Sequence, residues 1–136
     1  MKLVVDTNIL ISFFRNNPVR FIMINSQMLN LELYFPEHCW KELLGIKSSI
    51  SKYSKLPSGQ IDSIFEELKD IFMIVPDEFS KEFESGAKKL IHGKDIPVFA
   101  LALKLNCPIW SNEPGFKKQS SVEIFNTRAL RELINA

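Results

Sequence analysis

The 136-residue sequence predicts an α/β fold, a three-layer α/β/α sandwich around a mostly parallel sheet. Short apolar runs typical of strands alternate with longer segments whose apolar residues recur every three or four positions, the spacing of a helix. The length suits a single domain, residues 1–136, with one hydrophobic core. Hydrophobic residues make up 46% of the chain and charged residues 24%, which is the balance of a globular protein.

The first strand is expected at residues 3–5, where Leu-Val-Val is short, apolar and β-branched. Thr7 and Asn8 can cap the helix that follows, and Asn16-Asn17-Pro18 ends it. The same patterns predict a helix over 19–29, a strand over 31–35, a helix over 36–53, a turn at 57–59 and a helix over 61–70.

The second half continues the alternation. The continuous apolar run at 71–75 is typical of a strand covered on both faces. Helical spacing covers 77–91 and ends at Gly93. Residues 95–105 are almost uniformly apolar, which predicts a deeply buried helix. The remaining expected elements are a strand at 108–110, a helical turn at 113–118, a strand at 122–125 and a helix over 127–134.

Charge and cysteine content narrow the class of protein. Seventeen basic and sixteen acidic residues give a net charge of +1, whereas proteins that coat nucleic acid are far more basic. Any contact with a polyanion would then use a local basic patch or metal ions. Cys39 and Cys107 are too few for a disulfide framework, so we expect buried free thiols and a cytoplasmic location. No apolar run approaches the ~20 residues that cross a bilayer, so no membrane association is expected.

Four acidic residues fall where one crevice would form. Asp6 follows the first strand directly, and Glu113 follows the strand at 108–110. Asp95 opens the buried helix, and Glu42 flanks the apolar stripe of the helix that begins at residue 36. In open parallel sheets, ligands bind outside the carboxyl ends of the strands. We therefore expect these four side chains to converge.

Each acid also has a structural explanation. Asp6 can start a turn, Asp95 can cap a helix, Glu113 can complement a helix dipole, and Glu42 can be an ordinary surface charge. Together, however, four carboxylates with few basic neighbours repel one another unless protons or cations neutralise them. Oxygen-only ligands favour Mg²⁺ or Mn²⁺. Zinc is disfavoured because the two histidines and two cysteines show no ligand spacing.

The segments around the four acids resemble segments of PIN-domain nucleases, and they occur in the order found in that family. The matching segments are Val4-Val5-Asp6-Thr7-Asn8, Pro36 with Glu42-Leu43, Lys94-Asp95-Ile96-Pro97 with 98–102, and Trp110-Ser111-Asn112-Glu113 with Phe116-Lys117. The resemblance implies a PIN-like fold and metal-dependent hydrolysis of RNA phosphodiester bonds. Two positions depart from the family pattern: Glu113 stands where Asp is usual, and Gly115 stands where an acid is common.

The resemblance also implies roles for individual residues. The implied catalytic residues are Asp6, Glu42, Asp95 and Glu113, of which Asp6, Asp95 and Glu113 would hold the metal. Glu42 is a ligand or orients the attacking water. Glu37, on the other flank of the apolar stripe of the same helix, is the alternative residue for this role. Residues expected to support the carboxylates or touch a phosphate are Thr7, Asn8 and Asn112. Lys117 and Lys118 are expected to contact the RNA backbone.

Small PIN ribonucleases include VapC-type toxins, so the resemblance implies an antitoxin protein and a homodimer as partners. Phe13, Phe14 and Phe21 belong either to the core or to a dimer face. A different class of function stays open: the departures at Glu113 and Gly115 also suit a catalytically inactive PIN-like module that binds RNA or a protein. A phosphatase with Asp6 as nucleophile is a weaker alternative, because position 8 is Asn and not Asp.

Overall fold

The computed structural model describes residues 1–15 and 17–134; Asn16, part of the expected helix break, lies outside them. Within the described residues, five strands form one sheet in the order β3-β2-β1-β4-β5, and every pairing is parallel. The prediction of a mostly parallel sheet is thus confirmed. The strands are β1 (Lys2–Val5), β2 (Glu32–Pro36), β3 (Phe72–Val75), β4 (Ile109–Trp110) and β5 (Ile124–Phe125).

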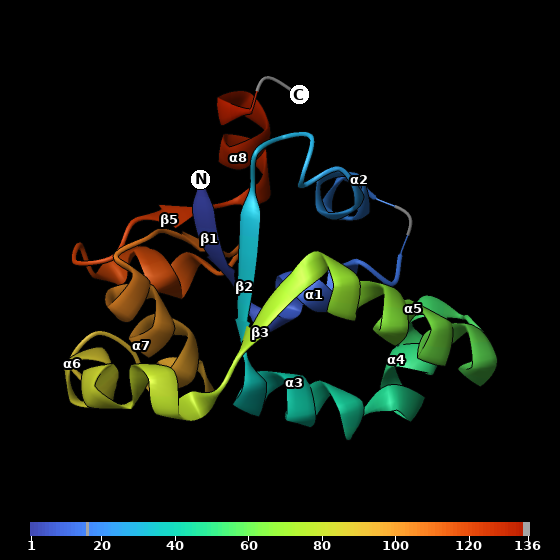
Figure 1. Cartoon of the computed structure of the whole chain (residues 1–136), viewed down its shortest axis with the longest axis horizontal. Coiled ribbons are helices and arrows are strands. Elements are labelled where there is room, and N and C mark those ends of the chain that lie inside the picture. Colours follow the sequence, from blue (N-terminus) through green and yellow to red (C-terminus); the bar gives the residue numbers. More distant parts are fainter. Residues whose placement is uncertain (16, 135–136) are drawn as a thin grey trace.

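Helices cover both faces of the sheet, which confirms the three-layer sandwich. Figure 1 shows α6 and α7 on one side of the strands and α1, α4 and α5 on the other. The α-helices are α1 (Thr7–Ser12), α2 (Pro18–Ile24), α3 (Glu37–Leu44), α4 (Lys47–Ser54), α5 (Ser58–Ile71), α6 (Glu84–Lys88), α7 (Ile96–Leu105) and α8 (Thr127–Leu133). Short 3₁₀ segments are η1 (Asp77–Phe83), η2 (Gly93–Asp95) and η3 (Pro114–Lys118).

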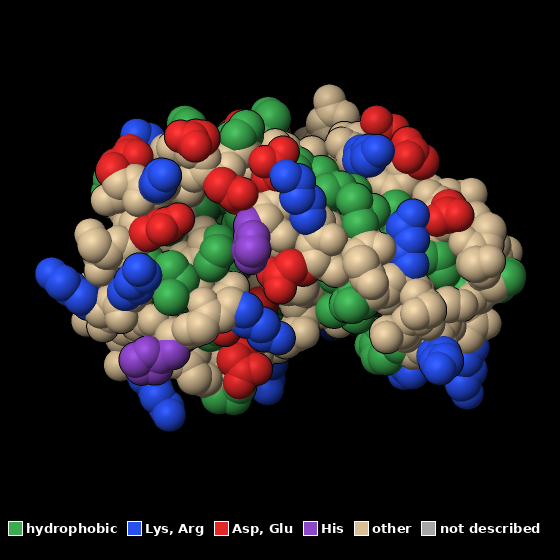
Figure 2. All heavy atoms as spheres, turned by 90° about the horizontal axis from the view of Figure 1, so that it is seen from below, with side chains coloured by type: hydrophobic (Ala, Val, Ile, Leu, Met, Phe, Trp, Pro, Cys, Tyr) green, Lys and Arg blue, Asp and Glu red, His purple; other side chains and the backbone are tan. Residues whose placement is uncertain are grey.

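The strand order reverses at β1. The chain proceeds outward from β1 to β2 and β3, then crosses the sheet to β4 on the other side of β1. In such sheets the crevice outside the carboxyl ends of the two strands at the reversal is the usual ligand site. In Figure 1 the N-terminus lies at the top, so the strands run downward, and Figure 2 looks from below onto their carboxyl ends.

The core is centred on α7, as its apolar sequence predicted. Residues 98–102 are all buried, and α7 packs on β1, β2 and β4. The ring of Phe99 lies 5.0 Å from that of Phe116, edge to face, and this contact ties η3 to α7. Phe13 and Phe14 are buried, so their alternative as a dimer face is wrong, whereas Phe21 is exposed.

Four expectations about single elements were wrong. The helix expected over 36–53 is two helices, because Gly45 and Ile46 interrupt the helical hydrogen bonding between α3 and α4. The helix expected over 19–29 ends at Ile24, and the one over 77–91 is divided into the 3₁₀ segment η1 and the short helix α6. The strand expected at 71–75 begins at Phe72 and is not covered on both faces: β3 is an edge strand, and Met73 is exposed.

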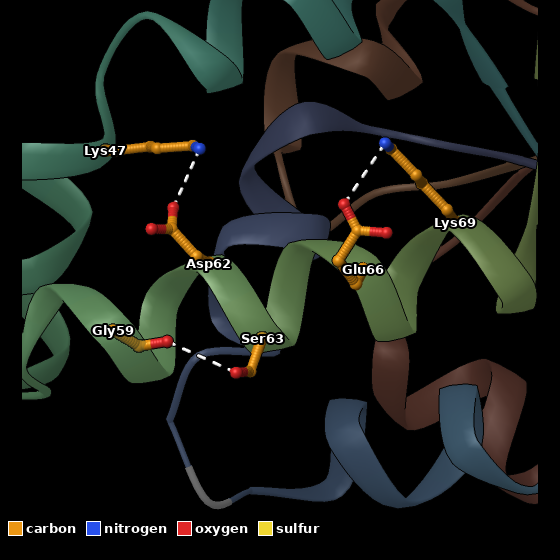
Figure 3. A network of polar contacts seen from close by, with 6 residues as sticks. All are labelled: Lys47, Gly59, Asp62, Ser63, Glu66 and Lys69. Carbon is orange, nitrogen blue, oxygen red and sulfur yellow. Dashed lines mark hydrogen bonds and ion pairs between the residues drawn. The ribbon is translucent and has the colours of Figure 1, made fainter.

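Polar contacts join the two helices that follow the break. The ammonium of Lys47 in α4 lies 2.8 Å from the carboxylate of Asp62 in α5 (Figure 3). Lys69 and Glu66 pair along α5 itself at 3.3 Å. Both pairs lie on an exposed surface, so each contributes little to stability. None of the described helices has the length and apolar character needed to span a bilayer.

Candidate active site

Asp6 lies at the reversal of strand order, directly after β1. Its backbone N–H donates to the carbonyl of Trp110 at 3.0 Å, and its carboxylate accepts a hydrogen bond from the hydroxyl of Ser111 at 2.9 Å. The side chain is 3% exposed. Asp6 occupies the N-cap position of α1, so the backbone N–H groups of Thr7 and Asn8 lie near its carboxylate. The hydroxyl of Ser111, the residue that follows β4, holds the carboxylate in place.

Ser111 is a residue of the candidate site to which sequence reasoning gave no role. It is buried; its hydroxyl donates to Asp6 and also accepts from the backbone N–H of Glu113 at 3.0 Å. One hydroxyl thus links two of the predicted site residues. The signal lies in the register: Val5 pairs with Trp110, so the next residues, Asp6 and Ser111, emerge side by side.

Asp95 closes η2 and precedes α7, as predicted. It stands at the N-cap position, yet its side chain caps none of the described N–H groups. Burial raises its pKa; the ammonium of Lys94 lowers it, and the charge of Glu113 raises it. The structure therefore brings Asp95 and Glu113 within electrostatic reach of each other, with Asp95 half-buried and Glu113 exposed.

The electrostatic environment of Asp6 indicates that Asp6 and Asp95 also lie within electrostatic reach of each other. Burial raises the pKa of its carboxyl, the Ser111 hydroxyl opposes that rise, and the charge of Asp95 adds to it. The N–H groups of Asn8 and Thr7 also lower it. A buried carboxylate next to a second one is costly to ionise unless a cation lies between them.

Cys39 shows that Glu42 belongs to the same region. Burial is the main cause that raises the pKa of its thiol to about 12, while the Thr7 hydroxyl lowers it. The negative charges of Glu42, Asp95 and Asp6 raise it further. The thiol is therefore close to three of the four predicted acids, and at this pKa it is no nucleophile.

Glu42 and its rival Glu37 lie in different surroundings. Glu42 lines an open pocket of about 290 Å³ together with Thr7, Asn8 and Lys94. Its Oε1 is 3.4 Å from Nε2 of His38, and its side chain is 52% exposed. Glu37 instead lies 3.8 Å from the ammonium of Lys41 and is absent from that pocket's lining among the described residues.

The predicted supporting residues divide into two groups. Thr7 lies beside Cys39, and Asn8 lines the pocket with Glu42. The side chain of Asn112 contacts α8 instead: its oxygen accepts a hydrogen bond from the backbone N–H of Thr127, at the start of α8, at 2.8 Å. Trp110 is fully buried and donates to the Thr127 hydroxyl at 3.0 Å, so it is a core residue. Lys117 and Lys118 are exposed at the end of η3.

The donor set limits the kind of ion that fits. In the described part of the chain, no three His, Cys, Asp or Glu side chains are gathered closely enough to enclose a metal ion. Magnesium does not require such a cage, because it keeps several waters and is usually held by one or two carboxylates. Asp6, whose ionisation is disfavoured by the charge of Asp95, forms with Asp95 a donor pair of that kind. The residues present fit a hydrated Mg²⁺ or Mn²⁺ ion.

Comparison with known proteins supports this fold. In a crystal structure titled VapBC2 from Rickettsia felis bound to a DNA fragment from their promoter, one chain matches with a TM-score of 0.63 and 20% identity. The match covers 93% of this chain and 98% of that one. No curated protein matches the sequence significantly. A sequence profile described as PIN domain matches residues 4–133, nearly the whole chain, and the protein therefore belongs to the PIN domain family.

Proposed function

We propose that this protein is a divalent-metal-dependent endoribonuclease and the toxin of a toxin–antitoxin pair. The observation that carries the proposal is the pair of Asp6 and Asp95 at the reversal of strand order, each with a raised pKa; Asp6 is held by the Ser111 hydroxyl, and Asp95 is not used as a helix cap within the described residues. Perturbed carboxyls in a crevice are typical of functional sites. Family membership adds that PIN domains are generally nucleases.

The chemistry follows from what each side chain can do. A bound Mg²⁺ or Mn²⁺ ion supplies the Lewis acid that polarises the phosphoryl group and neutralises the leaving oxygen. Asp6, held by Ser111, and Asp95 would bind that ion, and Glu113, in the segment before η3, would hold one of the ion's waters. Glu42 faces the pocket from α3 and would orient the attacking water and accept its proton.

Several residues would hold the substrate. Lys94 lines the same pocket as Glu42 and is placed to contact a phosphate. Lys117 and Lys118 would contact the RNA backbone beyond the acids. Thr7 and Asn8 would support the carboxylates or touch a phosphate. In this proposal Asn112 acts indirectly, because its side chain anchors α8 at Thr127.

The proposed partners follow from the family and from the exposed surface. We place the protein in the cytoplasm, with an antitoxin protein as its regulator. The similarity to a chain of the VapBC2 structure is compatible with this regulation. At 20% identity, that similarity supports the fold alone. A homodimer would use exposed apolar side chains on and after α2, namely Phe21, Ile24 and Met28.

Cleavage assays on two variants of α3 test the proposal. The wild-type protein is expected to cleave a labelled mixed-sequence RNA with Mn²⁺ or Mg²⁺ and not with EDTA. Glu42→Gln should lower the rate by about 10²-fold, because it removes the proposed proton acceptor. Glu37→Gln is the matched control, since it alters an exposed acid of the same helix, and it should stay near wild type. Equal losses in both variants would contradict the role of Glu42.

A non-catalytic PIN-like module is the second candidate, favoured by Glu113 and Gly115. A Cβ added at Gly115 meets no atom within 4 Å, so the missing acid is not excluded by packing. We therefore expect Gly115→Asp to fold normally and to bind Mn²⁺ several-fold more tightly, because it adds a carboxylate to the site. Gly115→Asn, of the same size without the charge, is the control, and calorimetric titration is the measurement. A gain of cleavage only in Gly115→Asp would show that the natural chain is the inactive module.

A further inference from the structure

A second pocket lies beyond the carboxyl ends of β2 and β3. It encloses about 350 Å³ between the start of α3, η1, α6 and the start of α7. Pro36 and Val75, the last paired residues of the two strands, form part of its wall. We call it the β2–β3 pocket. It opens on the same end of the sheet as Asp6, which is the end where parallel sheets bind ligands.

The β2–β3 pocket adjoins the candidate active site. Lys94 lines both this pocket and the one that contains Glu42. His38 lines the β2–β3 pocket, and its ring lies 3.4 Å from the carboxylate of Glu42. Two strand spacings, about 10 Å, separate the middle of the β2–β3 pair from the middle of the β1–β4 pair. A single extended ligand can therefore occupy both places.

Ser80 places a hydroxyl in the wall of the β2–β3 pocket. Its side chain lines the pocket although the residue is only 8% exposed. Within residues 1–15 and 17–134, its hydroxyl has no hydrogen-bond partner, and it is not sealed inside the protein. The hydroxyl is therefore available to a ligand in the pocket.

The lining of the β2–β3 pocket combines three kinds of surface. Apolar side chains from α7 form one wall, against which a flat ring can pack. Asp77 and Glu84 are acceptors. One oxygen of Asp77 accepts the backbone N–H of His38 at 3.0 Å, and no hydrogen bond from the described residues reaches the other oxygen. Lys88 and Lys94 supply positive charge. Figure 2 shows apolar side chains framed by acidic and basic ones beside a histidine.

We propose that the β2–β3 pocket binds the base of the nucleotide next to the scissile phosphate. Lys94, which lines both pockets, contacts the phosphate that lies between the β2–β3 pocket and the candidate active site. Asp77 and Glu84 accept hydrogen bonds, so the pocket prefers bases that carry an amino group, namely adenine, guanine and cytosine, over uracil. The wall from α7 packs against the base, and Ser80 bonds to its edge. This inference rests on the proposed function, because it takes RNA as the substrate.

Binding of mononucleotides to the full-length protein in EDTA tests the inference without any cleavage. We would titrate the ¹⁵N-labelled protein with AMP, GMP, CMP, UMP and ribose 5-phosphate and follow the backbone amide signals. The expected result is saturable shifts at Ser80, Glu84 and Lys94, with UMP several-fold weaker than the other nucleotides. Ribose 5-phosphate, which lacks a base, should bind most weakly.

Matched variants locate the binding. Ser80→Ala should weaken AMP binding about fivefold, the effect of one lost hydrogen bond, and Ser80→Leu should block the pocket. Lys94→Ala should weaken it about tenfold, because it removes a phosphate contact. The controls are Ser63→Ala and Lys69→Ala on α5 (Figure 3), where Ser63 bonds only to the backbone of Gly59 and Lys69 pairs with Glu66. Both should bind AMP like wild type.

Several outcomes would overturn the inference. These are no saturable shift with any nucleotide, equal binding of ribose 5-phosphate and AMP, or AMP binding that survives both Ser80→Ala and Lys94→Ala. Binding of an arginine-containing peptide in place of nucleotides would assign the pocket to a protein partner. If Ser80→Leu does not fold, Ser80→Ala and Lys94→Ala still decide. Nucleotide binding without RNA cleavage would contradict the proposed function and would leave the β2–β3 pocket as a nucleotide-binding site with no scissile phosphate beside it. Cleavage without nucleotide binding would overturn only this inference.

Discussion

Asp6→Asn is expected to lower metal-dependent RNA cleavage by about 10²-fold or more, the loss seen when one group that stabilises charge is removed from an active site. The substitution keeps the shape of the side chain, and the amide oxygen can still accept the Ser111 hydroxyl. It removes the buried negative charge on which cation binding would depend. The measurement is the single-turnover rate on labelled RNA with saturating Mn²⁺.

The control for Asp6→Asn is Asp62→Asn. Asp62 is an exposed acid of α5 that pairs with Lys47, far along the chain from the candidate site (Figure 3). This variant should cleave RNA at the wild-type rate, and circular dichroism should show both variants folded. Undiminished cleavage by Asp6→Asn would mean a contaminating nuclease or a site elsewhere on the molecule.

Phe99→Ala is expected to reduce the free energy of unfolding by roughly 3–5 kcal/mol, the usual cost of deleting a buried aromatic ring. Phe99 is fully buried in α7, and its ring packs on Phe116 at 5.0 Å. A small domain has only about 5–15 kcal/mol in total, so this variant should be close to unfolding at room temperature. Urea denaturation followed by fluorescence is the measurement.

The matched control for that substitution is Phe79→Ala. Phe79 is 44% exposed on η1, where its ring lies 5.3 Å from the ammonium of Lys104. Its removal should cost about 1 kcal/mol or less, the scale of an exposed cation–π contact. If both variants lost equal stability, α7 would not be the centre of the core.

The sequence predicted the order of strands and helices because the local patterns agree with the fold. The uniformly apolar stretch 96–105 is the buried helix α7, and its burial follows from composition alone. The break at Gly45 was missed because the apolar spacing of Leu43 and Ile50 continues across it. The edge position of β3 could not be read from its residues, since strand order depends on pairings between distant segments.

The candidate site was predictable to the same extent. The positions of Asp6 and Asp95 after a strand and before a helix are local features, so their place at one end of the sheet could be predicted. The partner of Asp6 could not, because Ser111 is 105 residues away and meets it only through the register of β1 with β4. The capping contact of Asn112 on α8 is equally non-local.

Direct titration with Mn²⁺, followed by electron paramagnetic resonance of the free ion, tests most directly whether the acids at the end of β1 form a cation site. Wild-type protein is expected to bind the ion saturably, and Asp6→Asn and Asp95→Asn should each weaken binding at least tenfold. Asp62→Asn should bind like wild type. Mn²⁺ binding that is absent from wild type, or that persists unchanged in both Asp6→Asn and Asp95→Asn, would contradict the metal site.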